Sequence, residues 1–456
     1  MTILEPFSAN FSARDFPIPE DAPVITTTLF FICTIFSAPK SIKTTGKLNF
    51  DNFDNTNFYI VGERDIFYRH LGLPSRNPIG LEIKDARGIF LYDKNGKDYI
   101  DLVSGVSVSN TGHGHPEIVQ AVKDQAATYM HLMVYGEFIQ SPQVKLAEKL
   151  ISHLPSGLDA VYFVNSGSEA IEGALKLAKR FTGRSEIVAF KNAYHGGSHG
   201  ALSVLGNESL KRAFRPLLPQ IRHLNFNNRN QLQEITGQTA CVVAETVQAE
   251  AGIILPDQDF LKNLRNRCSE TGTLLIIDDI QMGMGRSGKL FSFEKYGIVP
   301  DILALAKAFG GGMPLGGFIS SNKIMNSLTS SPELGHITTF GGHPVSCAAG
   351  LTALEIITRN NLPHLAENAG TIFKEALQYH PVIKEIRQCG LMLGIDFSEK
   401  VDPQKLLRSF IKNGLITDFF LFREHAFRIA PPLTISKDEI EITIERIKSA
   451  LNSLKC

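Results

Sequence analysis

The sequence lacks an excess of charge, a paired-cysteine motif and a long apolar run. Its 46 lysines and arginines balance 46 aspartates and glutamates, which argues against a partner such as nucleic acid or an anionic membrane. Its 6 cysteines include no Cys-x-x-Cys pair, so no zinc motif is present and a reducing compartment fits. No apolar run reaches the roughly 18 residues of a spanning helix. We therefore expect a cytoplasmic protein with no metal site, no nucleic-acid partner and no membrane anchor.

Residues 1–62 differ in composition from the rest of the chain. They are rich in Asn, Thr, Ser and Phe, without a clear period. The apolar stretch Val24–Ala38 is interrupted by threonines and follows mainly acidic residues, whereas a signal peptide carries positive charge before its apolar stretch. We expect a poorly ordered extension. A wrongly assigned start is the alternative, with the patterned chain beginning near Val61.

From about residue 85 the chain alternates between short apolar stretches and amphipathic segments. Gly88–Val103 predicts a β-hairpin with a turn at Asn95-Gly96, and His115-Pro116 begins a helix. Further strands are predicted at 160–164, 187–190, 240–244, 274–277 and 302–305, and helices at 170–180 and 260–271. This alternation predicts an α/β fold with a mostly parallel sheet that is covered on both faces.

The C-terminal region predicts a smaller α+β domain. Ser436–Glu439 is a capping box, and the apolar stripe that follows it is typical of core packing; its members are Ile440, Ile444, Ile447, Leu451 and Leu454. Strands are expected at 391–396 and 427–430, joined by the hairpin of residues 88–103. The predicted domains are a small domain from residues 63–112 and 346–456 and a large domain from residues 113–345.

The stretch Val164–Ala170 predicts an anion site. A strand ends, a turn of small residues follows and a helix begins, so that backbone N–H groups and the helix dipole attract negative charge. Gly167 lets the backbone approach the anion, and Ser168 adds a hydroxyl. The alternative is a plain strand-to-helix turn with Ser168 as the N-cap.

Asp278 ends an apolar strand, which is where ligands bind in open α/β sheets. The glycines that follow, Gly283, Gly285 and Gly288, formally match the dinucleotide fingerprint. However, four residues separate the strand from the first glycine, and no helical stripe follows the last one. A nicotinamide oxidoreductase is therefore kept only as an alternative.

Lys307 follows the apolar stretch 302–305, although burying an ammonium is costly. A lysine whose charge is disfavoured becomes a nucleophilic amine that suits Schiff-base chemistry. Asp278 ends a preceding strand, and two adjacent parallel strands bring such residues to one edge of a sheet. A pyridoxal phosphate site needs a lysine, a carboxylate, a stacking aromatic side chain and a phosphate cup. Tyr194 supplies the aromatic side chain, with a core tyrosine as its plainer interpretation.

These motifs resemble those of the class III (omega-type) aminotransferases of fold type I, which include acetylornithine, ornithine and 4-aminobutyrate aminotransferases. The resemblance covers roughly residues 65–456 and rests on motifs in family order: Asp101–Val108, Gly112–Pro116, Asn165–Ala170, Tyr194–Gly196, Glu245–Gly252, Asp278–Gln281, Lys307, Thr338–Pro344 and Arg428–Pro432. It implies a pyridoxal-phosphate transferase fold, with a large domain around a mostly parallel sheet and a smaller α+β domain from both chain ends.

The resemblance implies cofactor roles for the matching residues. Lys307 is expected to bind the cofactor aldehyde and then to move a proton, while Asp278 pairs with the pyridinium nitrogen. Ile280 and Tyr194 are expected to sandwich the ring. The remaining expected cofactor contacts are Gly167 and Ser168 at the phosphate, Gln281 at the ring hydroxyl, and His195 and Glu245 along the site.

The resemblance also implies substrate and partner contacts. Arg428 is expected to hold a substrate carboxylate bidentately, and Glu250 to pair with Arg428 when an ω-amine arrives. Val106 is a further expected substrate contact. Thr339 is expected to reach the cofactor of a second subunit, which implies a homodimer.

The sequence departs from the family pattern near the substrate side. Asp279 replaces a usual Glu, Thr246 a Pro, Gly197 an Arg and His343 an Asn; the run that contains Asp279 is reminiscent of diaminobutyrate aminotransferases. The donor therefore stays open. We expect amino transfer from an amino acid or ω-amine to a 2-oxo acid, 2-oxoglutarate by family habit. An aminomutase and a catalytically silent binding protein are the remaining alternatives, and the second conflicts with the retained lysine and aspartate.

Overall fold

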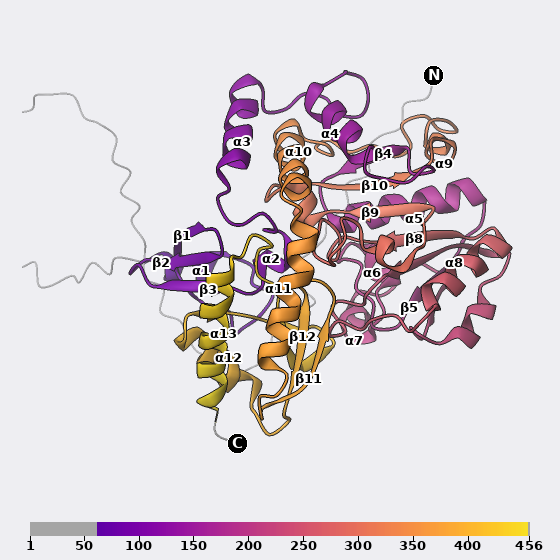
Figure 1. Cartoon of the computed structure of the whole chain (residues 1–456). Coiled ribbons are helices and arrows are strands. Elements are labelled where there is room, and N and C mark those ends of the chain that lie inside the picture. The colour runs from indigo at the N-terminus through magenta and orange to yellow at the C-terminus, as the bar shows by residue number, and fades with distance from the viewer. Residues whose placement is uncertain (1–61, 455–456) are drawn as a thin grey trace, which may run out of the picture. The chain divides into compact units, whose positions relative to one another are not determined.

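The computed structural model describes residues 62–454 (Figure 1). The chain divides into two compact units between Gly72 and Leu73. In the first unit, helix α1 (Glu63–His70) is preceded by Gly62, whose N–H donates to Oδ2 of Asp65 at 3.2 Å. The predictions for the N-terminal extension and its start near Val61 lie outside the described residues.

The second unit contains a seven-stranded sheet in the order β4-β10-β9-β8-β7-β5-β6. β10 runs antiparallel to both of its neighbours, and the other pairings are parallel. The strands are β4 (Ala160–Val164), β5 (Glu186–Phe190), β6 (Ile221–Leu224), β7 (Thr239–Glu245), β8 (Leu274–Asp278), β9 (Ile302–Leu305) and β10 (Gly316–Ser320). The predicted mostly parallel α/β sheet is confirmed, although β6 and β10 were not predicted.

Both faces of this sheet are buried, which explains why its strands are continuous apolar stretches. Along β7, Cys241 and Val243 pack into one hydrophobic cluster while Val242 and Ala244 pack into another, because successive side chains of a strand point to opposite faces. The helices α5 (Gly167–Thr182) and α6 (His199–Val204) contribute to the first cluster, and α8 (Phe260–Thr271) contributes to the second.

The unit has two further four-stranded sheets. β1-β2-β3-β13 joins segments from both ends of the unit, and β11-β12-β15-β14 comes from its C-terminal part. Their strands are β1 (Ile83–Arg87), β2 (Phe90–Asp93), β3 (Asp98–Asp101), β13 (Leu415–Ile416), β11 (Ile383–Gln388), β12 (Leu393–Phe397), β14 (Phe419–Phe420) and β15 (Arg423–Ile429). The predicted hairpin is confirmed as β2 and β3, with Gly96 at a φ of +82°. Its predicted partners were wrong: β3 pairs with β13, and not with β12 or β15, because the hairpin lies in the other sheet.

The larger helices outside the central sheet are α3 (Pro116–Thr128), α4 (Ser141–Ile151), α10 (Pro344–Arg359), α11 (Leu362–Leu377), α12 (Pro403–Lys412) and α13 (Lys437–Asn452). α10 packs against α3, α4 and α11. The capping box before α13 is confirmed by the reciprocal hydrogen bonds of Ser436 and Glu439, and most of its apolar stripe is buried. Because α10 begins at residue 344, the predicted domain boundary at 345/346 falls inside its first turn, and the division stays a prediction.

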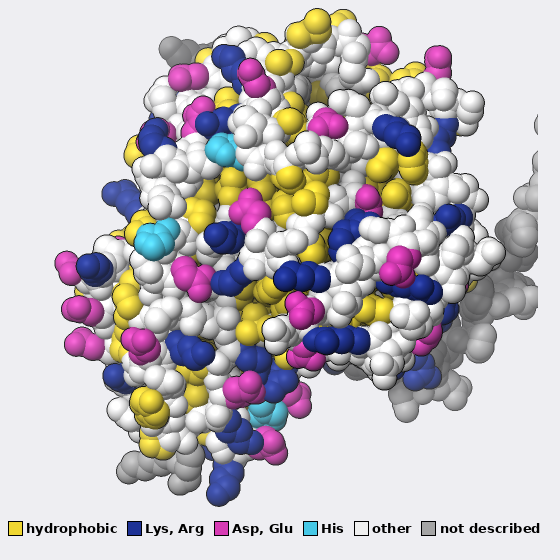
Figure 2. All heavy atoms as spheres, turned by 45° about the vertical axis from the view of Figure 1, so that its right-hand side comes forward, with side chains coloured by type: hydrophobic (Ala, Val, Ile, Leu, Met, Phe, Trp, Pro, Cys, Tyr) yellow, Lys and Arg dark blue, Asp and Glu magenta, His cyan; other side chains and the backbone are white. Residues whose placement is uncertain are grey.

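The surface of the described residues mixes both signs of charge. Figure 2 shows basic and acidic side chains interspersed across one face, with apolar side chains between them. Within residues 62–454, no helix combines the length and the apolar character that crossing a membrane requires. The same residues contain no cluster of three or more His, Cys, Asp or Glu side chains that could hold a metal ion.

Candidate active site

A cavity of about 430 Å³ lies at the carboxyl edge of the central sheet. Residues at or just after the ends of β4, β5, β7, β8 and β9 line it, because parallel strands end at the same edge. The structure brings together these predicted cofactor residues in its walls: Gly167, Ser168, Tyr194, His195, Glu245, Asp278, Ile280, Gln281 and Lys307. These predicted residues lie as much as 140 positions apart in the numbering, from 167 to 307.

The turn after β4 presents the N-terminus of α5 to this cavity. The N-cap is Ser166, whose Oγ accepts from the N–H of Glu169 at 3.2 Å, so the alternative of Ser168 as N-cap was wrong. Ser168 instead accepts a hydrogen bond from the N–H of Gly197 at 3.1 Å. Its hydroxyl and the first N–H groups of the helix form a cradle of the kind that binds phosphate.

Asp278 lies deep in the cavity beside His195. Its Oδ2 is 2.8 Å from Nδ1 of the imidazole, and the two side chains are 5% and 0% exposed. Oδ1 accepts from the N–H of Ile280 at 3.1 Å. A carboxylate this deeply buried requires a cationic partner, and the protonated ring nitrogen of pyridoxal phosphate would be one.

Glu245 is the neighbour of Asp278 in the register of β7 and β8. Burial raises the pKa of Glu245 well above its usual range, and the nearby charge of Asp278 raises it further. Its oxygens accept from the N–H groups of Ala249 at 3.1 Å and Tyr194 at 3.2 Å. Glu245 thus ties the loop after β7 to the segment that carries Tyr194.

Lys307 lies two residues after the end of β9, which pairs with β8 in parallel. Burial lowers the pKa of its ammonium, and the charges of Glu250 and Asp278 offset part of this effect. Its Nζ donates to Oε1 of Gln281 at 3.3 Å. The residue has a left-handed φ of +52°, a conformation that non-glycine residues adopt mainly where the surroundings enforce it.

A second group of charges continues from Gln281 toward the C-terminal sheet. Nε2 of Gln281 donates to Oε1 of Glu250 at 3.3 Å, and Nη2 of Arg428 donates to the same oxygen at 2.9 Å. Burial raises the pKa of Glu250, but the charge and hydrogen bond of Arg428 outweigh it and leave that pKa below its usual range. Arg428 is 1% exposed, and its Nη1 has no hydrogen-bond partner.

Two residues beside Arg428 were missed in the sequence. Oδ1 of Asp418 lies 3.0 Å from Nε of Arg428, and the ring centroid of Phe420 lies 4.8 Å from its Cζ. The available signal was Asp418 itself, which is the only charged residue in the apolar stretch 414–422. Like Lys307, Asp418 is a single charged residue in an apolar stretch.

Four predicted residues do not line the cavity: two are Glu250 and Arg428, described above, and the others are Val106 and Thr339. Val106 is half-buried in α2 (Ser104–Ser107), where its φ is +63°, and Val108 lines the cavity in its place. Thr339 is exposed and does not line the cavity of its own chain. The roles expected of both residues stay predictions.

The glycines after β8 do not form a dinucleotide site. Residues 283–288 form turns, and the next element is a 3-10 helix (Ser292–Tyr296) rather than an α-helix that begins at the glycines. A Cβ at Gly288 would lie 2.1 Å from Oε2 of Glu367. This glycine is therefore explained by packing within the protein.

The cavity has the parts of a pyridoxal phosphate site. It has room for the ring, a cradle for the phosphate, the buried carboxylate of Asp278 for a ring nitrogen, and the amine of Lys307 for an aldehyde. The fold and the site thus define a pyridoxal-phosphate enzyme.

Comparison with known proteins identifies the family. The family model described as aminotransferase class-III matches residues 73–451. Acetylornithine aminotransferase of Methanopyrus kandleri is 36% identical over 388 residues, covering 84% of this chain and 97% of its own. That of Bacillus subtilis is 36% identical over 376 residues, covering 81% and 95%. A structure of Toxoplasma gondii ornithine aminotransferase with partial occupancy of PLP has a TM-score of 0.80 at 27% identity, covering 87% and 95%.

The chain belongs to the class III aminotransferases. It is a transaminase that uses pyridoxal phosphate and has the fold that the resemblance implied.

Proposed function

We propose that the enzyme takes an amino group from a basic amino acid or ω-amine and gives it to 2-oxoglutarate. The observation that carries this proposal is the buried pair of Arg428 and Glu250, whose side chains lie 2.9 Å apart and are linked to Lys307 through Gln281. The relatives support this class of donor, because the proteins of Methanopyrus kandleri and Toxoplasma gondii are acetylornithine and ornithine aminotransferases.

The pair provides two states for two substrates. While Glu250 holds Arg428, the guanidinium is neutralised and does not attract a carboxylate, which suits a donor that presents an amine. When Glu250 turns away, the planar fork of Arg428 is free to hold the carboxylate next to the keto group of the acceptor by two hydrogen bonds. One site then accepts both substrates in turn.

Pyridoxal phosphate supplies an aldehyde that takes up the amino group and a ring that withdraws electrons from the reacting carbon. Lys307 would hold that aldehyde through Nζ. Once displaced, it would carry a proton between the substrate carbon that bears the amino group and the aldehyde carbon of the cofactor. Asp278 would keep the ring nitrogen protonated, and His195 orients Asp278 through the contact of 2.8 Å. Tyr194 and Ile280 would enclose the ring between them.

The enzyme is proposed to act as a cytoplasmic homodimer in which Thr339 reaches the cofactor phosphate of the second subunit. Its exposed position in this chain fits that role, and the free thiols of the described cysteines 241, 268, 347 and 389 fit a reducing compartment. Sedimentation velocity on the holoenzyme should give a dimer. A fully active monomer would contradict the proposed role of Thr339.

The lysine assignment is tested by covalent trapping. Borohydride should bleach the yellow holoenzyme and fix the cofactor to the peptide that contains Lys307, as mass spectrometry can identify. The variant Lys307→Ala should bind the cofactor without being trapped. Equal trapping in that variant would show that another amine holds the aldehyde.

The proposed role of Arg428 in holding the acceptor carboxylate, here called the clamp, is tested with a panel of donors against 2-oxoglutarate. The donors are acetylornithine, ornithine, 4-aminobutyrate, diaminobutyrate and lysine. Arg428→Met should raise the KM for 2-oxoglutarate about 100-fold, because it removes hydrogen bonds worth roughly 3 kcal/mol. Arg359→Met is the control, since that side chain is 55% exposed on the surface. An unchanged KM in Arg428→Met would refute the clamp, and donor conversion without consumption of 2-oxoglutarate would indicate an aminomutase.

A further inference from the structure

We propose that Asp418 is a positioning residue that masks one nitrogen of Arg428, so that Glu250 holds the guanidinium weakly enough for a 2-oxo acid to displace it. The inference rests on the proposed function of the Arg428–Glu250 pair. It concerns which edge of the guanidinium each carboxylate can reach.

The contacts of Arg428 are divided among its three nitrogens. Nε lies 3.0 Å from Oδ1 of Asp418, Nη2 donates to Glu250 at 2.9 Å, and Nη1 has no partner. Nε and Nη2 form one bidentate edge of a guanidinium, while Nη1 and Nη2 form another. Asp418 occupies half of the first edge, which leaves Glu250 with a single hydrogen bond from Nη2.

The contact between Asp418 and Arg428 is an ion pair without the alignment of a hydrogen bond, because neither Nε nor Oδ1 has a hydrogen-bond partner. The two residues are nevertheless fixed in register: the N–H of Arg428 donates to the backbone oxygen of Asp418 at 3.1 Å. The Phe420 ring covers the guanidinium at 4.8 Å. Arg428 is thus held independently of Glu250.

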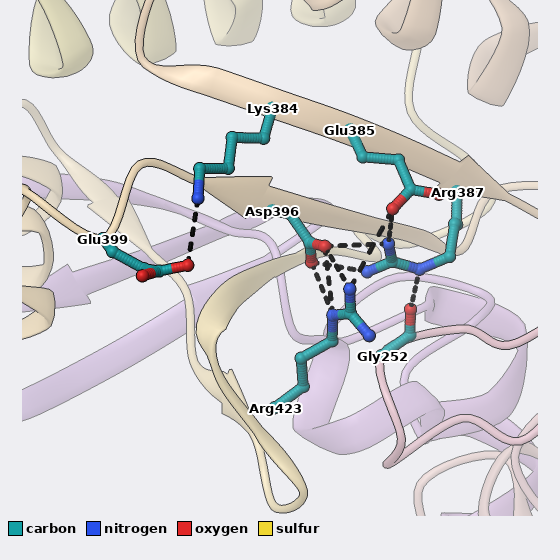
Figure 3. A network of polar contacts seen from close by, with 7 residues as sticks. All are labelled: Gly252, Lys384, Glu385, Arg387, Asp396, Glu399 and Arg423. Carbon is teal, nitrogen blue, oxygen red and sulfur yellow. Dashed lines mark hydrogen bonds and ion pairs between the residues drawn. The ribbon is translucent and has the colours of Figure 1, made fainter.

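The backbone around Glu250 is also fixed, so that its side chain is the part that has to move. The N–H of Phe422 donates to the backbone oxygen of Glu250 at 3.0 Å. Figure 3 shows Arg387 and Arg423 converging on Asp396, and Nε of Arg387 reaching the oxygen of Gly252 at 2.6 Å. The Asp396 carboxylate therefore fixes both segments: it holds the Glu250 loop through Arg387, and it holds β15, which carries Arg428, through Arg423.

Arg428 therefore makes different numbers of hydrogen bonds when it pairs with Glu250 and when it binds the acceptor carboxylate. Glu250 pairs with Arg428 through one nitrogen, whereas the carboxylate of an incoming acceptor can take Nη1 and Nη2 together. Oε2 of Glu250 accepts from the N–H of Leu421 at 3.3 Å. Without Asp418, Glu250 could exchange this bond for one from Nε while Oε1 keeps Nη2, and so form a bidentate pair of its own. By preventing this second pair, Asp418 favours the acceptor carboxylate over Glu250 in binding to Arg428.

The test measures binding of glutarate, a dicarboxylate that cannot react, to the holoenzyme by isothermal titration calorimetry. Asp418→Ala should weaken glutarate binding about tenfold or more, the effect of roughly one extra charge-assisted hydrogen bond to Glu250. The rate of the donor half-reaction, followed by the absorbance of the cofactor, should change less than about twofold, because the donor binds while Glu250 is in place. Glu424→Ala is the control, since that acid lies on β15 together with Arg428 and is 88% exposed.

The double variant Asp418→Ala/Glu250→Ala separates this role from a structural one. If Asp418 acts by limiting Glu250, its substitution should no longer weaken glutarate binding once Glu250 is absent. An equal loss in both backgrounds, or no loss in either, would overturn the proposal. If Asp418→Ala does not fold, Asp418→Asn should show the same dependence on Glu250. Glutarate binding that is unchanged in Arg428→Met would instead refute the proposed clamp.

Discussion

The substitution Gly196→Ala tests whether the turn that contains Ser168 holds the cofactor phosphate. Gly196 has a φ of +128°, and a Cβ there would lie 2.2 Å from Oγ of Ser168 and 3.0 Å from its Cα. The backbone conformation alone disfavours alanine by about 1–3 kcal/mol. Overpacking adds about 1–3 kcal/mol unless the neighbour moves. We expect the Ser168 side chain to move, because its hydroxyl is the nearest atom.

Displacing this hydroxyl breaks its hydrogen bond from the N–H of Gly197, which is 3.1 Å long, and the contact that we predict with the phosphate. A hydrogen bond to a charged group contributes about 1.5–3 kcal/mol, which corresponds to roughly a 10–150-fold change in Kd. Titration of the apoenzyme with pyridoxal phosphate, followed by absorbance of the bound cofactor, should show Gly196→Ala weakened by this factor.

The neighbouring residue provides a matched control. A Cβ at Gly197 would meet no atom within 4 Å, and its φ lies outside the left-handed region. Gly197→Ala adds the same methyl group one position away and should leave the Kd for the cofactor within about twofold of the wild type, as is usual for an exposed substitution. Equal Kd values for the two variants would refute the role assigned to Ser168.

Three further predictions concern stability. Burial raises the pKa of Asp279 from 3.8 to about 7, so the folded state binds more protons than the unfolded state between these values. The free energy of unfolding should then fall by up to about 4 kcal/mol from pH 4 to pH 7, and urea titrations of Asp279→Asn should show a flatter pH dependence. Gly173→Ala should lower the free energy of unfolding by about 1–3 kcal/mol, because its Cβ would lie 2.2 Å from the Phe318 ring; an unchanged Tm would contradict this. Asp396→Ala should lower it by about 3 kcal/mol in urea titrations, since two arginines lose their shared carboxylate, whereas Glu399→Ala, an exposed acid of the same region, should change it by less than about 0.5 kcal/mol.

The proximity of Lys307 and Asp278 was predictable because one topological rule places the ends of neighbouring parallel strands together. Lys307 and Asp278 each follow an apolar stretch, and parallel strands end at the same edge of a sheet. The structure pairs β8 with β9 so that Asp278 lies opposite Ala304, three residues before the lysine. The strand order alone therefore places the two residues near each other, and no side-chain contact has to be known beforehand.

The strand between β4 and β9 was not predictable by the same rule. β10 (Gly316–Ser320) begins with two glycines after a glycine-rich stretch, and glycine in a strand interior weakens the strand signal. The structure explains one of them: a Cβ at Gly316 would lie 2.4 Å from the backbone oxygen of Ser166. The glycine is required by the close approach of the turn after β4, which is a tertiary contact that composition does not reveal.

Asp418 shows why an anomalous charge is interpretable in one place and not in another. Like Lys307, it is a lone charge in an apolar stretch, yet its partner depends on the register of a short antiparallel pair. In β14 and β15, Phe419 lies opposite Phe427, but Phe420 lies opposite Arg423, so the register shifts within two residues. A shift of one residue turns every side chain to the other face of a strand. The sequence therefore marks Asp418 as unusual, whereas only the irregular pairing places it against Arg428, and no general rule predicts that irregularity.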